Sequence, residues 1–158
     1  MKSIITIGDC NGIGLEVLFK ALFHFHSNVL SSNQYFTLCG NTETIIEYAQ
    51  KMGYNVEIHD ANVILNNTLE LHILEIGNYS PIKFGTMTES AAELAVNSLE
   101  TAIQRTISRD YDAIITLPIS KVALNRIGWK FPGQTEMLAD YCNVPNPMMI
   151  LAGDSLRV

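Results

Sequence analysis

The run DAIITL at residues 112–117 constrains the fold of this chain more than any other feature of its sequence. Short runs of apolar, β-branched residues are typical of strands that are buried on both faces of a parallel sheet. Pro118 ends the run, and the polar residues Ser120 and Lys121 follow it. Because open α/β sheets bind ligands just beyond the carboxyl ends of their strands, residues 112–136 are predicted to form one wall of a small-molecule pocket.

The rest of the chain alternates between extended and helical patterns, which indicates an α/β fold. Strands are predicted at residues 4–7 and 35–39, and helices at residues 15–25, 42–52, 87–109 and 135–142. Residues 56–59 and 68–76, separated by the turn-prone pair Asn66-Asn67, are predicted to form an antiparallel excursion. A further buried strand is expected at residues 148–152, then a turn at 153–155 and a new extended segment at 156–158.

The predicted helix at residues 87–109 has a face of small residues, formed by Ala91, Ala95, Ser98 and Ala102. Such a face permits close approach, either to the sheet or to a partner subunit, and we expect the sheet.

Three glycines, Gly8, Gly12 and Gly14, lie between the first predicted strand and the first predicted helix. Their spacing differs from the dinucleotide-binding pattern, and no acidic residue lies between Glu16 and Glu43 to bind a ribose. A classical dinucleotide site is therefore rejected here. The glycines are equally well explained as the residues of a tight turn that binds no ligand.

The composition limits the partners of the chain. With 158 residues, 47% of them hydrophobic, the chain is expected to fold as one globular domain. A net charge of −6 argues against nucleic acid or an anionic membrane as a partner, since both require a basic face. No signal-peptide core or membrane span is found in the sequence, and a cytoplasmic location is expected.

The cysteines and histidines do not form a recognisable metal or disulfide pattern. Three cysteines are present, with no Cys-x-x-Cys pair, so we expect reduced thiols rather than a disulfide framework or a structural zinc site. The four histidines are isolated from clustered carboxylates, and no metal site is predicted from them.

Four segments in order, at residues 7–16, 112–121, 132–139 and 148–158, resemble the 4-hydroxythreonine-4-phosphate dehydrogenase family. Their sequences are IGDCNGIGLE, DAIITLPISK, PGQTEMLA and MMILAGDSLRV. The resemblance implies a three-layer α/β fold like that of the isocitrate and isopropylmalate dehydrogenases, of which this chain would be the amino-terminal part. Residues 1–143 would belong to the first α/β domain, and residues 144–158 would be the first strand and the start of a second, truncated domain.

The resemblance also implies an activity. Enzymes of this family use NAD or NADP and a divalent metal (zinc, magnesium or cobalt) to oxidise 4-phosphohydroxy-L-threonine. The β-keto acid product loses carbon dioxide, in the biosynthesis of pyridoxal 5'-phosphate, and the enzymes are homodimers. The metal-binding histidines and most cofactor contacts of the family lie beyond the position of Val158. We therefore expect the metal ligands beyond residue 158, and we predict that this chain alone is inactive.

The resemblance assigns Gln134 and Thr135 to the substrate-binding pair of the family. A threonine hydroxyl and the exposed N–H groups at a helix start can bind an anion without a net positive charge. Gln134 stands where the family usually has histidine, and glutamine cannot carry a proton at neutral pH. Lys121 is either a partner for a phosphate or carboxylate group, or simply an exposed lysine at a helix start. No catalytic or cofactor-binding residue is assigned within the chain.

Two other interpretations stay open. The chain could be a degenerate, non-catalytic module of the same fold that binds a phosphorylated ligand at Thr135. It could also be an α/β domain whose loops have only a structural role, although this would leave the order of the four segments unexplained.

Overall fold

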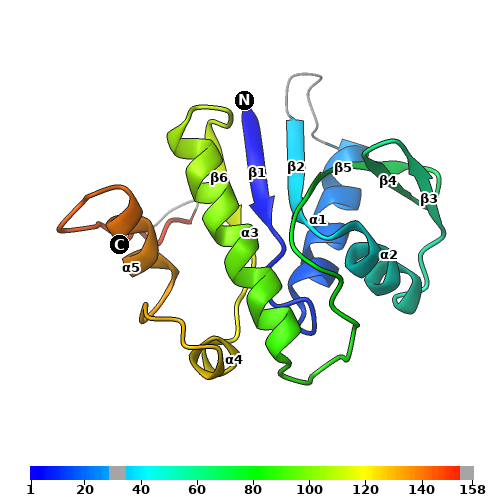
Figure 1. Cartoon of the computed structure of the whole chain (residues 1–158). Helices are drawn as coiled ribbons and strands as arrows, with labels where there is room; N and C mark the ends of the chain where they lie inside the picture. The colour runs from blue at the N-terminus through cyan, green and yellow to red at the C-terminus, as the bar shows by residue number, and fades with distance from the viewer. Residues whose placement is uncertain (29–34, 154–158) are drawn as a thin grey trace.

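The computed structural model describes residues 1–28 and 35–153 of the chain. Figure 1 shows its helices and strands, which alternate along most of the chain. The strands are β1 (Lys2–Thr6), β2 (Tyr35–Gly40), β3 (Val56–His59), β4 (Asn62–Leu65), β5 (Leu69–Glu75) and β6 (Ala113–Thr116). The helices are α1 (Gly14–Asn28), α2 (Thr42–Lys51), α3 (Glu89–Ile107), α4 (Lys121–Arg126) and α5 (Gln134–Tyr141).

The described strands form one mixed sheet with the order β3-β4-β5-β2-β1-β6. β1 pairs in parallel with β2 and β6, and β2 pairs in parallel with β5. The two hairpins β3-β4 and β4-β5 are antiparallel. The carboxyl ends of β1, β2, β5 and β6 therefore meet at the same edge of the sheet, where a ligand site is expected in this fold class.

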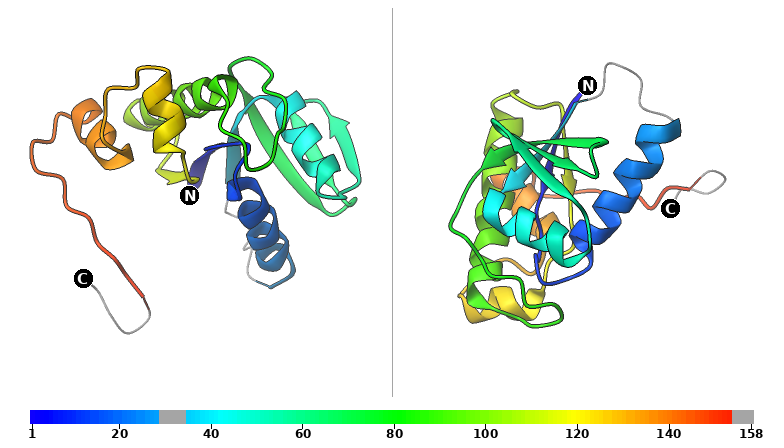
Figure 2. Two further views of the ribbon diagram at one scale, coloured as in Figure 1. Left: turned by 90° about the horizontal axis from the view of Figure 1, so that it is seen from below. Right: turned by 90° about the vertical axis from the view of Figure 1, so that its right-hand side faces the viewer.

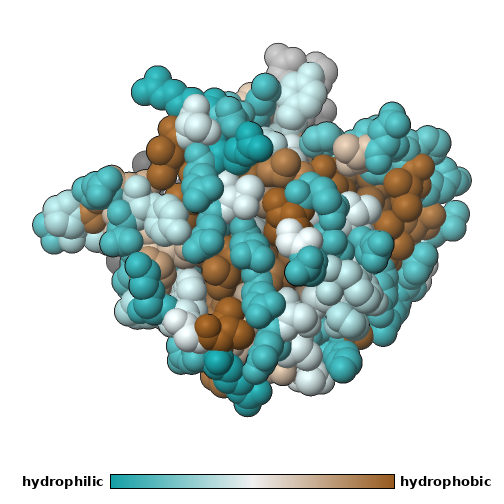
Figure 3. All heavy atoms as spheres, in the orientation of Figure 1, coloured by the Kyte–Doolittle hydropathy of each residue, from teal (hydrophilic) through white to brown (hydrophobic). Residues whose placement is uncertain are grey.

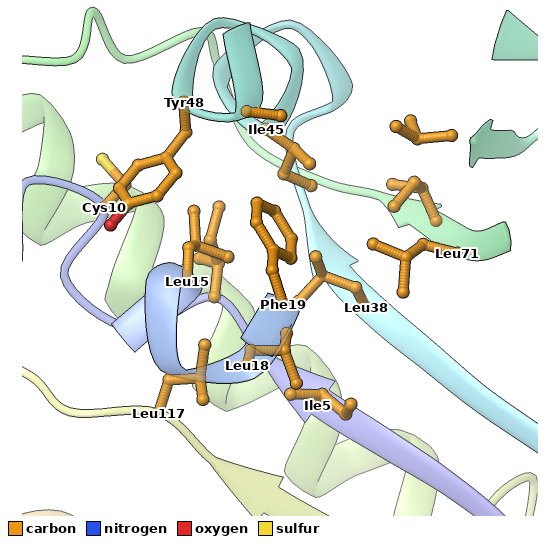
Figure 4. Close-up of a cluster of buried hydrophobic side chains, with 14 of the residues drawn as sticks. Ile5, Cys10, Leu15, Leu18, Phe19, Leu38, Ile45, Tyr48, Leu71 and Leu117 are labelled. Carbon is orange, nitrogen blue, oxygen red and sulfur yellow. The ribbon is translucent and has the colours of Figure 1, made fainter. Parts of the chain in front are cut away.

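Helices cover both faces of the sheet, so the molecule has the three layers of an α/β fold (Figure 2). Successive residues of β1 point to opposite faces: Ile4 packs with Ala102 of α3, and Ile5 packs in the same cluster as α1 and α2. Figure 4 shows this second cluster, in which Phe19 of α1 lies between the sheet and α2.

The small-residue face of α3 packs on the sheet, as predicted. Ala91, Ala95, Ser98 and Ala102 are all buried. The Ser98 hydroxyl accepts a hydrogen bond from the N–H of Ile7 (3.0 Å) and donates one to the carbonyl of Cys39 (2.6 Å). These two bonds fasten α3 to the ends of β1 and β2. Hydrophilic side chains cover the outer side of the same helix (Figure 3).

The antiparallel excursion after α2 is confirmed, and it contains one strand more than predicted. β4 lies between the two predicted segments and pairs with both β3 and β5. Asn66 and Asn67 form the turn between β4 and β5, with φ angles of 51° and 56°. Asparagine is one of the few non-glycine residues that adopts this left-handed conformation readily.

Two predictions about buried strands are wrong. β6 is not buried on both faces: it pairs only with β1 in the described sheet, and 40% of Ile115 is exposed. Residues 148–151 are extended but exposed, with Met148 85% and Leu151 69% accessible, because no described strand pairs with them. The turn and extended segment predicted beyond Gly153 fall on residues 154–158, outside the described part of the chain.

The sequence also predicts reduced thiols and no membrane-spanning segment. All three cysteines are free; Cys10 and Cys39 are buried, and Cys142 is exposed. Within residues 1–28 and 35–153, no helix has both the length and the apolar character needed to span a lipid bilayer.

Candidate functional site

The connections that follow β1 and β6 contact one another at the carboxyl edge of the sheet. The N–H of Asp9 donates a hydrogen bond of 2.8 Å to the carbonyl of Pro118. Gly8 has a φ of +63°, and a Cβ atom there would lie 2.5 Å from that same carbonyl oxygen. Only glycine allows this close approach, so the contact between the two connections depends on Gly8.

The glycine-rich segment after β1 is a packing turn whose polar groups bond to the protein. The N–H groups of Asn11 and Gly12 donate to the side chain and carbonyl of Asp9, respectively. The Asn11 side chain accepts from the N–H of Lys83 (2.6 Å) and donates to the Thr88 hydroxyl (3.1 Å). Because these donors already have acceptors within the protein, the structure favours the turn interpretation over a phosphate-binding loop.

Lys121 and the start of α5 lie close together, near the carboxyl end of β6. Lys121 is the first residue of α4, which Ser120 caps through a bond from the N–H of Ala123 (3.4 Å). Gly133 is the N-cap of α5 and provides no capping side chain. A Cβ atom at Gly133 would stand 2.9 Å from a carboxylate oxygen of Glu136 and 3.6 Å from the Lys121 ammonium nitrogen. Lys121 and the Glu136 carboxylate therefore both lie beside the start of α5.

Gln134 fastens α5 to the end of β6. Its side-chain Nε2 donates a hydrogen bond of 3.1 Å to the carbonyl of Leu117, the residue that follows β6. Gln134 is half-buried, and this bond leaves the amide oxygen and the second amide N–H of its side chain for other partners. Sequence reasoning did not predict this role, because a backbone carbonyl acceptor leaves no signal in the sequence.

Thr135 lines a groove between α5 and the extended segment that follows it. The groove has a volume of about 320 Å³ and is mostly apolar; its other walls include Leu138, Val144, Met148 and Met149. Thr135 thus lies at the start of α5 with its side chain on a concave surface. The structure brings all three predicted site residues, Lys121, Gln134 and Thr135, to the same end of α5.

The segment that carries this cluster has few acidic residues, although the chain as a whole is acidic. Residues 113–135 contain Lys121, Arg126 and Lys130 but no aspartate or glutamate, although the whole chain has a net charge of −6. Glu136 is the first carboxylate after this stretch and lies in the first turn of α5, where the helix dipole stabilises a negative charge. Lys121 and the uncapped helix start are groups that can bind an anion, and the Glu136 carboxylate lies beside them.

Trp129 is the only tryptophan of the chain and packs close to this cluster. It lies against Leu99, Ile103 and Met137, between α3 and α5, and its ring meets that of Phe131 edge to face at 5.7 Å. Its fluorescence is therefore a natural probe of changes at the start of α5.

Two other pockets on the described surface are lined by none of the three predicted site residues. One, of about 420 Å³, lies at the amino ends of β1 and β2 and contains the Arg105–Asp110 ion pair (3.0 Å). The other, of about 360 Å³, lies between Gly12, Tyr48 and Phe84 and is mostly apolar.

The described residues do not fit a metal ion. Residues 1–28 and 35–153 contain no group of three or more His, Cys, Asp or Glu side chains close enough to hold one. We therefore derive no metal-dependent step from this part of the chain.

The buried thiols are not activated as nucleophiles. Burial is the main cause that raises the pKa of both Cys10 and Cys39 to about 11, so both are protonated at neutral pH.

Comparison with known proteins decides the family. Residues 32–158 match the family model of the pyridoxal phosphate biosynthetic protein PdxA. This chain belongs to the PdxA family. The resemblance inferred from the four sequence segments is thus confirmed.

Relatives of the PdxA family match nearly the whole chain with about half of their own length. A protein from Bradyrhizobium diazoefficiens, described as a candidate D-threonate 4-phosphate dehydrogenase, is 30% identical over 98% of this chain and 45% of its own. The 4-hydroxythreonine-4-phosphate dehydrogenase from a Synechocystis strain is 33% identical over 98% of this chain and 43% of its own. The chain therefore spans about half the length of the curated relatives it matches.

A solved structure agrees with the fold. The crystal structure of a 4-hydroxythreonine-4-phosphate dehydrogenase from Burkholderia phymatum superposes with a TM-score of 0.78 at 27% identity. The match covers 99% of this chain and 48% of that one. The α/β fold predicted from the sequence is therefore that of PdxA-family structures over about half of their chains.

Proposed function

We propose that this chain supplies the phosphate-holding part of a substrate site in an NAD- or NADP-dependent dehydrogenase of small 4-phosphorylated hydroxy acids. The observation that carries the proposal is the position of Lys121 beside the uncapped start of α5, at the ligand-binding edge of the sheet. Family membership supports the dehydrogenase class.

In this proposal each residue has a distinct role. The Lys121 ammonium group neutralises the phosphate, and the first N–H groups of α5 and the Thr135 hydroxyl donate hydrogen bonds to it. Gln134 holds α5 against β6 through its bond to Leu117, and it does not exchange a proton.

Two substrates fit this chemistry. The first is 4-phosphohydroxy-L-threonine, whose oxidation gives a β-keto acid that loses carbon dioxide, in pyridoxal 5'-phosphate biosynthesis. The second is D-threonate 4-phosphate, which the name of the Bradyrhizobium relative supports. The two molecules share the phosphate and differ at carbon 2, which carries an amino group in the first and a hydroxyl group in the second.

The redox chemistry itself is assigned to sequence outside this chain. In the proposal, the ligands of a divalent metal and the contacts to the nicotinamide cofactor come from the part of the relatives that follows the matched half. The division into residues 1–143 and 144–158, the homodimer and the cytoplasmic location belong to the same proposal. The 158-residue chain alone is predicted to bind the phosphorylated ligand but not to reduce NAD or NADP.

The proposal is tested by titrating both phosphorylated compounds into the chain, with Trp129 fluorescence and calorimetry as the readouts. Lys121→Ala is expected to weaken binding about tenfold, since one charge-assisted bond contributes roughly 1.5 kcal/mol. Lys2→Ala removes the same charge at the opposite end of β1 and serves as the matched control. Equal affinities for the two variants would contradict the assigned site.

A separate outcome distinguishes the second candidate, a non-catalytic module of the same fold. A module would bind the compounds in the same way. A longer chain, extended by the sequence that corresponds to the second half of the relatives, would then not reduce NAD or NADP. Reduction by the 158-residue chain alone would contradict the predicted division of the site.

A further inference from the structure

The pocket of about 420 Å³ at the amino ends of the strands lies on the α3 side of the sheet. Thr37 of β2 pairs in register with Ile4, which packs with Ala102 of α3, so both side chains point to that side. α3 packs mainly against β1, β2 and β6, and β5 extends beside it (Figure 1). This pocket is called the amino-end recess, and its lining includes Lys2, Tyr35, Thr37, Leu74, Arg105 and Tyr111.

The sheet face beside the recess has the composition of a surface that faces solvent. The buried residues of β5 are Leu69, Leu71 and Ile73. Glu70 and His72, which lie between them, are exposed. Such alternation is typical of a sheet that is covered on one face and open on the other. The open face continues onto β3 and β4 with Glu57, His59 and Asn62. The recess therefore opens toward solvent.

Thr37 distinguishes this recess from an ordinary depression of the surface. The residue is only 6% exposed, yet its hydroxyl makes no hydrogen bond within the described part of the chain. In residues 1–28 and 35–153, the one side-chain polar atom that is both enclosed and unpartnered is Nε1 of Trp129. The Thr37 hydroxyl is therefore not enclosed, and it opens into the recess that Thr37 lines. Because buried hydroxyls are normally hydrogen-bonded, this one is available to a ligand.

Other hydrogen-bond donors without a partner line the same recess. Among the described residues, the Lys2 ammonium group and the hydroxyls of Tyr35 and Tyr111 form no side-chain hydrogen bond or ion pair. The Arg105 guanidinium donates through Nη1 to Asp110 (3.0 Å) and keeps further N–H groups. Donors from β1, β2 and the end of α3 thus meet in one recess, and the matching ligand group is a hydrogen-bond acceptor.

The charges around the recess set the charge of that acceptor. Lys2 and Arg105 are the cations of the lining, and Asp110 is its carboxylate. A second carboxylate, that of Asp112, accepts a hydrogen bond from the backbone N–H of Lys2 (2.8 Å). His72 lies at the side, with its Nδ1 2.9 Å from Oδ1 of Asn62. Carbonyls at the end of α3 accept bonds from the N–H groups of residues 108–110, which offsets the negative end of the helix. This balance suits a small anion rather than a polyanion.

The apolar part of the lining suits a flat ring. Leu74 is half-buried, and the side chains of Tyr35 and Tyr111 line the recess without a ring contact to any other described aromatic residue. Tyrosine rings bind other rings through offset or edge-to-face contacts. A volume of about 420 Å³ is also within the usual range for small-molecule sites.

We propose that the amino-end recess binds a small anion that carries a flat ring, with a carboxylate or a phosphate as the anionic group. The Thr37 hydroxyl and the Lys2 ammonium group donate hydrogen bonds to the anionic group, and the ring contacts Tyr35, Leu74 and Tyr111. The recess lies at the opposite ends of the strands from Lys121, Gln134 and Thr135, so it is a second site. The inference does not depend on the substrate proposed above, since neither of those aliphatic compounds has a ring.

The experiment adds phenyl phosphate, benzoate, inorganic phosphate or phenol to the 158-residue chain and follows the backbone amides by NMR. We expect saturable shifts at Lys2, Tyr35, Thr37 and Tyr111 with phenyl phosphate or benzoate. The tighter of these two identifies the anionic group. Its affinity is expected to exceed those of inorganic phosphate and phenol at least about tenfold, because each of the latter has only one of the two recognised parts.

Two variants test the donors. Thr37→Val removes the hydroxyl at nearly unchanged size and is expected to weaken binding about fivefold. Lys2→Met removes the charge but keeps the length of the side chain, and is expected to weaken binding about tenfold. Lys20→Met is the matched control and should bind like the original chain. It removes the same charge from an exposed position of α1, on the other face of the sheet.

Circular dichroism must show that Thr37→Val folds like the original chain. Tyr35→Phe removes a second donor at a position that is 64% exposed, where no effect on folding is expected, and it should also weaken binding. Absence of saturable binding at millimolar concentrations of both ring compounds would overturn the proposal. So would equal affinity for inorganic phosphate or phenol, shifts confined to the start of α5, or an affinity that either Thr37→Val or Lys2→Met leaves unchanged.

Discussion

Gly8 is the residue on which the junction between β1 and β6 depends. Its positive φ and the 2.5 Å separation between an added Cβ and the Pro118 carbonyl oxygen are two independent obstacles to any side chain. The sequence indicates only that the segment is rich in glycine. It cannot show which glycine meets Pro118, because the two residues are 110 positions apart and their contact follows from the pairing of β1 with β6.

Gly8→Ala is expected to destabilise the chain by about 3 kcal/mol, as the sum of left-handed backbone strain and a clash in the packed interior. Gly53→Ala is the matched control, because Gly53 also has a positive φ (+84°) but has no atom within 4 Å of an added Cβ. It is expected to cost only about 1 kcal/mol. Urea unfolding measures both values, and equal losses would show that the contact with Pro118 is unimportant.

At the scale of elements, α2 holds the connection between β5 and α3 through Glu47. The Glu47 carboxylate accepts hydrogen bonds from the Tyr79 hydroxyl (2.7 Å) and the N–H of Ile82 (3.1 Å), and it pairs with Lys51 (3.1 Å). Partial desolvation acts to raise the pKa of Glu47, but these hydrogen bonds and the lysine outweigh it and lower the pKa below its ordinary value of 4.5.

Since the pKa of Glu47 is lower in the folded chain than in the unfolded chain, its contribution to stability is present above pH 4.5 and is lost as the pH falls below it. Glu47→Gln is expected to reduce the free energy of unfolding by about 1–2 kcal/mol at pH 7, and by much less near pH 3. Urea unfolding at the two pH values measures this difference. Glu43→Gln, in the first turn of the same helix, is the control. A loss for Glu47→Gln that does not change with pH would contradict the account.

Periodicity predicted most of the elements but not all of their environments. The helix at residues 15–25 and the small-residue face of α3 rest on long patterns, and both were predicted correctly. β4 has only four residues and was not predicted. Residues 148–152 were predicted as a buried strand from their apolar character. Burial requires a neighbouring segment, however, and the described chain provides none.

For the whole molecule, the candidate site was only partly accessible from the sequence. The family resemblance indicated Gln134 and Thr135, and the position of Lys121 after a strand indicated a binding role or an exposed helix start. Their convergence around Gly133 depends on how α4 and α5 fold back onto the end of β6, which is a tertiary property. The bond from Gln134 to Leu117 depends on the same arrangement.

The central claim is that the start of α5, beside Lys121, holds the phosphate of the substrate. The most direct measurement is the NMR shift of each backbone amide when 4-phosphohydroxy-L-threonine or D-threonate 4-phosphate is added to the chain. The account predicts that the largest shifts occur at Lys121, Gln134, Thr135 and Glu136. Larger shifts in the glycine-rich turn at residues 8–14, or no shifts at millimolar concentrations of either compound, would contradict it.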